Sequence, residues 1–222
     1  MASRTLGTVV IFSGIAILTV VGLSVPWHRS AREPALVERS IETGPVEHLT
    51  VNGLWTVRIV SSADDGVRVD LPSGDSASDA VRYDNGELIL SGNGLRARRE
   101  AVIAAPNLHR VEINGAARIT LDGISTDALD IEVDGTGSIE ASEARIGRLE
   151  VRSDGAARID LADAVVHDAN LEVDGAARID LTMDGGVLSG EIDGAARVRY
   201  DGTVSSQTVN IDGLGRVEGP GN

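Results

Sequence analysis

The chain has 222 residues, enough for one domain and an additional segment, and 42% of its residues are apolar while only 2% are aromatic. With 26 glycines and no cysteine, this composition predicts a narrow aliphatic core and excludes disulfides and thiol chemistry. The formal net charge of -14 argues against nucleic acids as partners, because binding to a phosphate backbone requires a basic surface.

The first expected element is a membrane-spanning helix. Residues 6–25 carry no charged side chain, and twenty helical residues span about 30 Å, the thickness of the hydrocarbon core of a bilayer. We therefore expect residues 1–27 to be a transmembrane anchor or uncleaved signal. A cleaved signal peptide, with Gly22 and Ser24 as the small residues before the cut, is the alternative. More basic residues follow the segment than precede it, so the positive-inside rule leaves its orientation open.

A linker and a β domain are expected after this segment. Residues 28–44 are polar and scattered with breakers, which is typical of a linker. The β domain is then expected over 45–218, with 219–222 as a tail. Its first part, 45–108, contains a strand, an Asn-Gly turn and a second strand that we interpret as the first coil, followed by irregular or capping strands.

The second part of the domain, 109–218, contains one pattern six times: two alternating apolar residues, Asn or Asp, Gly, small residues, Arg and a further apolar residue. The central glycines recur at intervals of 20, 20, 20, 19 and 19 residues. They are Gly115, Gly135, Gly155, Gly175, Gly194 and Gly213. A fixed period of this length is typical of a solenoid.

This alternation predicts an all-β fold, a parallel β-helix with about 20 residues per coil. Apolar residues of one parity lie on both sides of each glycine, and only small residues stand two positions after it, where a corner brings the backbone close to the interior. We expect Asn-Gly and Asp-Gly to make this corner by adopting positive φ. A meander of β-hairpins is the alternative use of these turns, but it gives no reason for a fixed interval.

Two charged ladders are expected on the solvent side of the coils. One residue before each glycine stands Asn or Asp, and three residues after it stands Arg or, once, Ser. Stacked side chains about 4.8 Å apart repel one another, and we expect Asp beside Arg around the bend to offset this repulsion. The candidate binding surface consists of Asp134, Asp154, Asp174, Asp193 and Asp212 with Arg118, Arg158, Arg178, Arg197 and Arg216. Asn114 and Ser138 occupy the equivalent positions where the ladders depart from Asp and Arg.

The repeated unit, from its first copy at 51–57 onward, resembles the bacterial head GIN domain, also called the auto-transporter adhesin family, over most of residues 45–218. The resemblance implies a right-handed parallel β-helix in cell-envelope proteins, carried behind a signal or membrane segment. It implies adhesion only by analogy, and it supplies no catalytic or ligand-binding residues. It also implies export, so we expect the β domain outside the cytoplasm, in the periplasm or at the cell exterior.

Little else in the sequence points to chemistry. Four histidines are scattered without the spacing of a zinc site, and we expect them at the surface: His28, His48, His109 and His167. The stretch 130–140 opens like a calcium loop, but its alternation indicates a strand. No cofactor is expected. The alternative is weak calcium binding at the surface, on an acidic stripe formed by Glu112, Glu132, Glu172 and Glu191.

The sequence therefore predicts a non-enzymatic, membrane-anchored envelope solenoid that binds an envelope glycan or protein, or serves as a scaffold. One alternative is a self-assembling polymer, because the open strand edges of a coil can pair with another copy. Pro220, close to the end, favours a cap instead. A less favoured alternative is a polysaccharide-acting enzyme that uses carboxylates such as Asp160 and Asp180, but these residues are ordinary members of the repeat.

Overall fold

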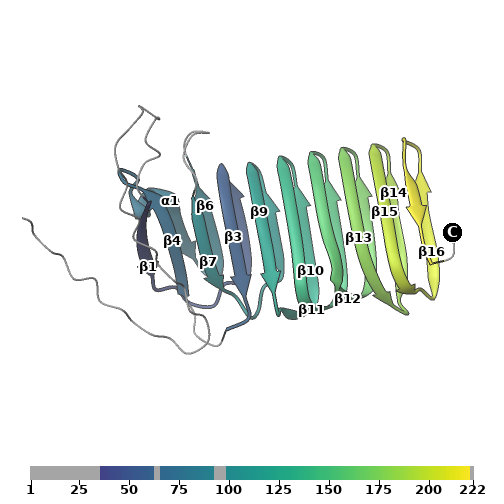
Figure 1. Cartoon of the computed structure of the whole chain (residues 1–222), viewed down its shortest axis with the longest axis horizontal. Helices are drawn as coiled ribbons and strands as arrows, with labels where there is room; N and C mark the ends of the chain where they lie inside the picture. The colour runs from purple at the N-terminus through teal and green to yellow at the C-terminus, as the bar shows by residue number, and fades with distance from the viewer. Residues whose placement is uncertain (1–35, 63–65, 93–98, 221–222) are drawn as a thin grey trace, which may run out of the picture. The chain divides into compact units, whose positions relative to one another are not determined.

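The computed structural model describes residues 36–62, 66–92 and 99–220. These residues form an all-β solenoid whose parallel strands pair at intervals of roughly 20 residues (Figure 1). The expected membrane segment, 6–25 within 1–27, and the first part of the expected linker, 28–35, lie outside the described residues. Within the part of the chain that the structure describes, no helix is long and apolar enough to cross a bilayer.

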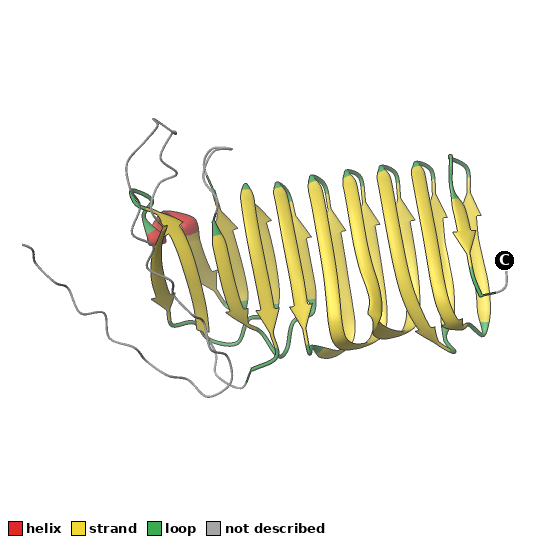
Figure 2. Ribbon diagram, viewed as in Figure 1, coloured by secondary structure: helices red, strands yellow, loops and turns green. Residues whose placement is uncertain are grey.

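Each coil contributes strands to two faces, and β11 and β12 bend from the second face to the first (Figure 2). The first face stacks, in spatial order, β6 (Glu87–Ser91), β2 (His48–Asn52), β8 (Arg110–Ile113), β10 (Ser125–Val133), the second halves of β11 (Thr136–Ser153) and β12 (Ala156–Val173), β14 (Val187–Ile192) and β16 (Ser206–Ile211). The second face stacks β7 (Glu100–Ala104), β3 (Leu54–Val60), β9 (Ala116–Asp122), the first halves of β11 and β12, β13 (Ala176–Asp184), β15 (Ala195–Thr203) and β17 (Arg216–Glu218).

The strands stack in register, so equivalent residues of successive repeats lie directly beside one another. Ile139 pairs with Ile119 on one side and with Ile159 on the other, and all three are at most 1% exposed. The predicted parity is therefore confirmed: one set of alternating residues fills a thin core of Val, Ile, Leu and Ala between the two faces. Ser153 also points into this core, between Val133 and Val173.

The irregular segment between β3 and β8 covers the N-terminal end of the stack. The chain leaves β3, adds β6 and β7 on the outer side of β2 and β3, and then returns to place β8 and β9 on the inner side. The first coil in sequence is thus the second in space. Antiparallel strands and a short helix complete this end: β4 (Gly66–Pro72) on β7, β5 (Val81–Asp84) on β6, and α1 (Ala77–Ala80). Covering strands of this kind protect a sheet edge.

Part of the segment expected to be a linker is a strand. β1 (Leu36–Ile41) pairs antiparallel with β4 along six residues. Its side chains are mostly exposed, including Leu36 at 43% and Val37 at 38%, so the periodicity that marks a half-buried strand is missing from the sequence. The pairing satisfies the backbone hydrogen-bonding groups along the edge of β4. Because the partner is another segment of the chain, residues 28–44 alone do not indicate this strand.

Candidate functional site

The candidate surface begins at the corner that joins the first face to the second, where each repeat carries its central glycine. The backbone N–H groups of Asp154 and Gly155 both donate to the carbonyl of Val133, at 3.1 Å each, and the N–H of Ala156 donates to the carbonyl of Gly135 at 2.9 Å. The same bonds recur in the other regular coils. Each corner is therefore tied directly to the preceding one.

Close approach between coils is the reason for glycine at these corners. None of the six central glycines has a positive φ, so the expectation that Asn-Gly and Asp-Gly bend the chain through positive φ is wrong. A Cβ on Gly155 would lie 2.0 Å from the carbonyl oxygen of Gly135, and a Cβ on Gly175 would lie 2.0 Å from that of Gly155. The glycine column exists because no other residue fits between stacked corners.

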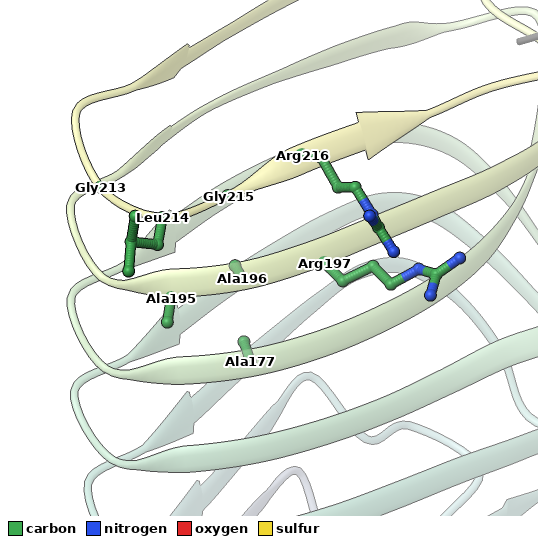
Figure 3. A pocket seen from close by; sticks show the side chains of 8 residues that line it. All are labelled: Ala177, Ala195, Ala196, Arg197, Gly213, Leu214, Gly215 and Arg216. Carbon is green, nitrogen blue, oxygen red and sulfur yellow. The ribbon is translucent and has the colours of Figure 1, made fainter.

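The arginine ladder stands on the second face directly after the corner. Its members pair in register from β9 to β17, with Ser138 between Arg118 and Arg158. Arg158 and Arg178 are both exposed, and register stacking places neighbouring positions about one strand spacing apart. The six ladder positions therefore lie in register, with Ser138 as an interruption among the arginines. Figure 3 shows the last two members of the ladder, Arg197 and Arg216, on adjacent strands with side chains extending in the same direction.

The acidic partners of this ladder differ from those expected. Arg178 Nε lies 3.1 Å from Asp180 Oδ2, and Arg158 Nη2 lies 3.7 Å from Asp160 Oδ2. Both acids are two positions further along the same strand and point outward on the same side. Among the described residues, Arg118 has no ion-pair partner.

The last two arginines share one carboxylate. Glu218 Oε2 and Oε1 lie 2.7 Å from Arg197 Nη2 and Arg216 Nε, respectively. The hydrogen bond from Arg197 is the main cause that lowers the pKa of Glu218, and the charges of Arg197 and Arg216 add to it. Glu218 therefore stays ionised and holds the two guanidinium groups in place.

The aspartate ladder is separate from the arginine ladder. Asp134, Asp154, Asp174, Asp193 and Asp212 are all exposed at the corners, and within the described chain none of them forms an ion pair with the arginines across the bend. The corner directs the Asp side chains away from the second face, so the expected Asp-Arg compensation around the bend is wrong. The two ladders are two surfaces of opposite charge on either side of the corner.

The acidic stripe on the first face is neutralised by two arginines. Arg110 Nη1 lies 2.8 Å from Asp130 Oδ2, and Arg110 also contacts Glu132. Arg152 replaces a glutamate of the stripe, lies 3.4 Å from Asp130 and 3.1 Å from Glu172, and contacts a further glutamate of its own strand. Desolvation opposes the charge of Arg152, but these carboxylates outweigh it and raise the pKa of the guanidinium.

The acids nearest the C-terminal end lie beyond the reach of these arginines. Oxygen atoms of Glu191, Asp193 and Asp212 all lie within 4.8 Å of one another, and all three residues are exposed. Nothing else in the described residues points to an ion there. The calcium-loop-like stretch 130–140 consists of the end of β10 and the start of β11, joined by the two-residue corner at Asp134 and Gly135.

The remaining candidates are surface residues. His48, His109 and His167 are exposed, and His28 lies outside the described residues. His167 Nδ1 lies 2.7 Å from Asp184 Oδ1, and this hydrogen bond raises the pKa of the imidazole. Asp160 and Asp180 stack directly on each other in the register of β12 and β13. Each of them contacts an arginine of the ladder. This arrangement gives neither aspartate a feature that marks it as a catalytic acid or base.

Sequence reasoning missed two residues that organise these surfaces, Arg110 and Glu218. Arg110 stands 20 residues before Asp130, one coil away, so the period itself could have indicated that the two are stacked. Glu218 is one coil beyond Arg199 and two positions after Arg216. The available signal was the spacing of two residues between Arg216 and Glu218, which places both side chains on the same side of one strand. The same spacing relates Arg178 to Asp180.

Comparison with known proteins shows which family the chain resembles. Residues 46–166 match a family model described as "putative auto-transporter adhesin, head GIN domain". No curated protein is matched by the sequence.

Several solved structures are similar in fold. A protein described as a putative adhesin from Bacteroides fragilis is 16% identical, with a TM-score of 0.67 over 83% of this chain and 96% of that one. A putative adhesin from Parabacteroides distasonis is 15% identical, with a TM-score of 0.49 over 84% and 98%. A putative lipid binding protein from the same species is 13% identical, with a TM-score of 0.48 over 83% and 96%. The Bacteroides fragilis structure supports the solenoid fold.

Proposed function

Because the chain belongs to the head GIN domain family, we propose that it is a non-enzymatic binding or scaffolding domain of the bacterial cell envelope. In this proposal the N-terminal segment anchors it in the membrane, and the solenoid, wound in the right-handed sense, lies outside the cytoplasm. The description of the Bacteroides fragilis relative as an adhesin supports a role in binding.

The observation that carries the proposal is the in-register arginine ladder, which only Ser138 interrupts. Arg118, Ser138 and Arg158 form its first part, in register on three successive coils. Arg118 has no ion pair with another described residue, and the contact of Arg158 with Asp160 is long, at 3.7 Å. These side chains therefore retain donors for a ligand, and guanidinium groups recognise carboxylate and phosphate with paired hydrogen bonds.

The ligand that fits this surface best is an extended anionic glycan of the envelope. A repetitive polymer can contact successive rungs, since the donors recur at about one strand spacing, and several weak contacts on one polymer add to a useful affinity. The aspartate corner repels such a polymer, and the arginines of the first face are already paired with its acidic stripe, so we expect binding on the second face.

A binding measurement tests this assignment. The full-length protein, in detergent, is applied to an array of charged and neutral envelope glycans. We expect retention on anionic glycans that weakens with salt, because exposed charges are screened. The double variant Arg118→Ala, Arg158→Ala should bind about tenfold less, from the loss of roughly two exposed ion pairs. Arg148→Ala is the matched control, since Arg148 is an exposed arginine on the first face. Equal binding by the double variant, or a blank array, contradicts the proposed ligand surface.

Two further measurements address location and chemistry. Protease added to intact cells and to spheroplasts should degrade the solenoid in at least one of these preparations if the domain lies outside the cytoplasm, and protection in both contradicts export. Incubation with envelope polysaccharides should release no reducing sugar ends. Their release would support the enzyme alternative.

A further inference from the structure

We propose that the C-terminal end of the solenoid is an interface with a second copy of this chain, joined tail to tail. In this dimer β17 pairs antiparallel with the β17 of the second copy, and β16 pairs with its β16, about one two-fold axis. The inference goes beyond the proposed function, because it concerns the end of the stack and uses only Arg216, the last member of the arginine ladder.

The C-terminal end is open within the described residues. β16 pairs only with β14, and β17 only with β15, so each has a free edge (Figure 1). The core is also cut off at this end. Ile211 is 38% exposed, whereas its register partner Ile192 is fully buried, and Val217 is only half-buried beside the fully buried Val198. Free backbone next to exposed apolar side chains is a template for pairing with another chain.

Leu214 adds a large apolar side chain where the five preceding regular units have alanine or threonine. The equivalent positions of the two preceding coils are Ala195 and Ala176, whereas Leu214 is 87% exposed. It lines a shallow depression together with Arg216 and the alanines of the neighbouring coils (Figure 3). Together with Ile211 and Val217, Leu214 gives this end of the stack a group of exposed or half-buried apolar side chains, which is typical of an interface.

The hydrogen bonds of the last coil show which backbone groups are free. The N–H of Leu214 donates to Gly194, at 2.9 Å, and the N–H of Asp212 donates to Ile192, at 3.0 Å. Because alternate residues of a strand direct their backbone groups to opposite edges, the groups of Val217 and Val209 point away from the preceding coil. Val217 can therefore exchange two hydrogen bonds with the partner's Val217.

Antiparallel pairing centred on Val217 is complementary in charge. It places Arg216 opposite the partner's Glu218 and, by symmetry, Glu218 opposite the partner's Arg216. Opposite charges facing each other across antiparallel strands are stabilising. The same register sets Leu214 against the partner's Pro220, which covers the exposed leucine.

One axis serves both faces. Val209 stands four residues before Gly213 and Val217 four residues after it, so the two lie opposite each other across the core. A two-fold axis through both therefore also centres β16 on its copy, with Thr208 opposite the partner's Asn210. Both of these side chains are uncharged and can hydrogen-bond, and no like charges face each other on either strand.

The two-fold arrangement also explains why association stops at two copies. It uses one self-complementary surface and closes. A head-to-tail polymer would instead need the N-terminal end, where β1, β4 and β5 run antiparallel to their neighbours and cover the edge. In the dimer the two β1 strands lie at opposite outer ends, a geometry suited to joining two surfaces.

The oligomeric state of the full-length protein in density-matched detergent tests the interface. Sedimentation equilibrium should give twice the mass of one chain, without larger species. The variant Leu214→Asp should dissociate at least about tenfold more readily. Its fold should be unaffected, because the leucine is exposed in the single copy. Arg178→Glu, two coils inside the stack, should remain dimeric. A wild-type monomer, an open polymer, or a fully dimeric Leu214→Asp variant overturns the proposal.

A charge exchange tests the register. Arg216→Glu and Glu218→Arg each place like charges opposite each other, and each should weaken dimers by about tenfold. A mixture of the two variants restores both opposite-charge pairs, so mixed dimers should form with affinity near that of the wild type. Mixed dimers require folded end coils, so their recovery cannot come from misfolding. Absence of mixed dimers, with both variants folded by circular dichroism, contradicts this register. None of these changes touches Arg118 or Arg158, so the glycan test is independent.

Discussion

Replacing Ser153 with valine is predicted to stabilise the solenoid. Ser153 points into the core and is 1% exposed, and its hydroxyl is buried without a hydrogen-bond partner. Its register neighbours, Val133 and Val173, are 0% and 1% exposed. The serine is therefore a polar break in an otherwise apolar column.

The expected gain follows from three contributions. An unpaired buried hydroxyl costs about 1–3 kcal/mol, and burial of additional hydrocarbon contributes about 1 kcal/mol. Overpacking opposes these by up to about 1–3 kcal/mol where the site is tight. Because valine already occupies the equivalent position in both adjacent coils, we expect little overpacking and a net gain of about 2 kcal/mol. In a chain of this size, that corresponds to a rise in Tm of about 4–8 °C.

Thermal unfolding followed by calorimetry or circular dichroism measures this effect. Ser125→Val is the matched control, since Ser125 is an exposed serine at the start of β10. Its free energy of unfolding should change by no more than about 0.5 kcal/mol. An unchanged or lower Tm for Ser153→Val would refute the argument that the register directs this side chain into a dry core.

Three further predictions concern the corners and the charged faces. Gly155→Ala should destabilise the protein by about 3 kcal/mol in denaturant unfolding, because the new Cβ meets the Gly135 carbonyl; wild-type stability would show that the coils are not in close contact. Burial, with nearby carboxylates, raises the pKa of Asp70, so its ionised form opposes folding above that pKa. Asp70→Asn should thus stabilise by about 0.5 kcal/mol at pH 7, with the gain vanishing as the pH falls through the titration of Asp70; a gain that persists in acid contradicts this cause. Arg152→Ala should lower stability by about 1 kcal/mol in low salt and less in high salt, whereas Arg148→Ala should change little; equal effects would refute a special role for Arg152.

Regular repeats made much of the fold predictable. Alternation on both sides of each glycine identified the buried residues of β8 to β15, because a period of two within a period of about 20 allows only one set of inward positions. The ladder of Arg158 and Arg178 followed from the same register.

The parts that depend on non-local backbone pairing were not predictable. β1 is exposed and pairs with β4 through main-chain groups, which leave no pattern in side-chain type. The spatial order of β6 and β7, outside β2 and β3, depends on how the chain closes the end of the stack. At the corners, the glycines were recognised but for the wrong reason, because steric exclusion by a neighbouring coil and a positive φ leave the same signature in one sequence.

The central claim is that equivalent residues of successive coils lie directly beside one another. Since the chain has no cysteine, the double variant Arg158→Cys, Arg178→Cys tests this claim with no background. Register pairing of these positions places their Cα atoms about 4.8 Å apart, within the range that a disulfide can bridge. Mild oxidation should therefore form an intramolecular disulfide in this variant and none in Arg148→Cys, Arg178→Cys, whose sites lie on opposite faces. Failure to cross-link the first pair, or equal cross-linking of both, would contradict the stacked solenoid.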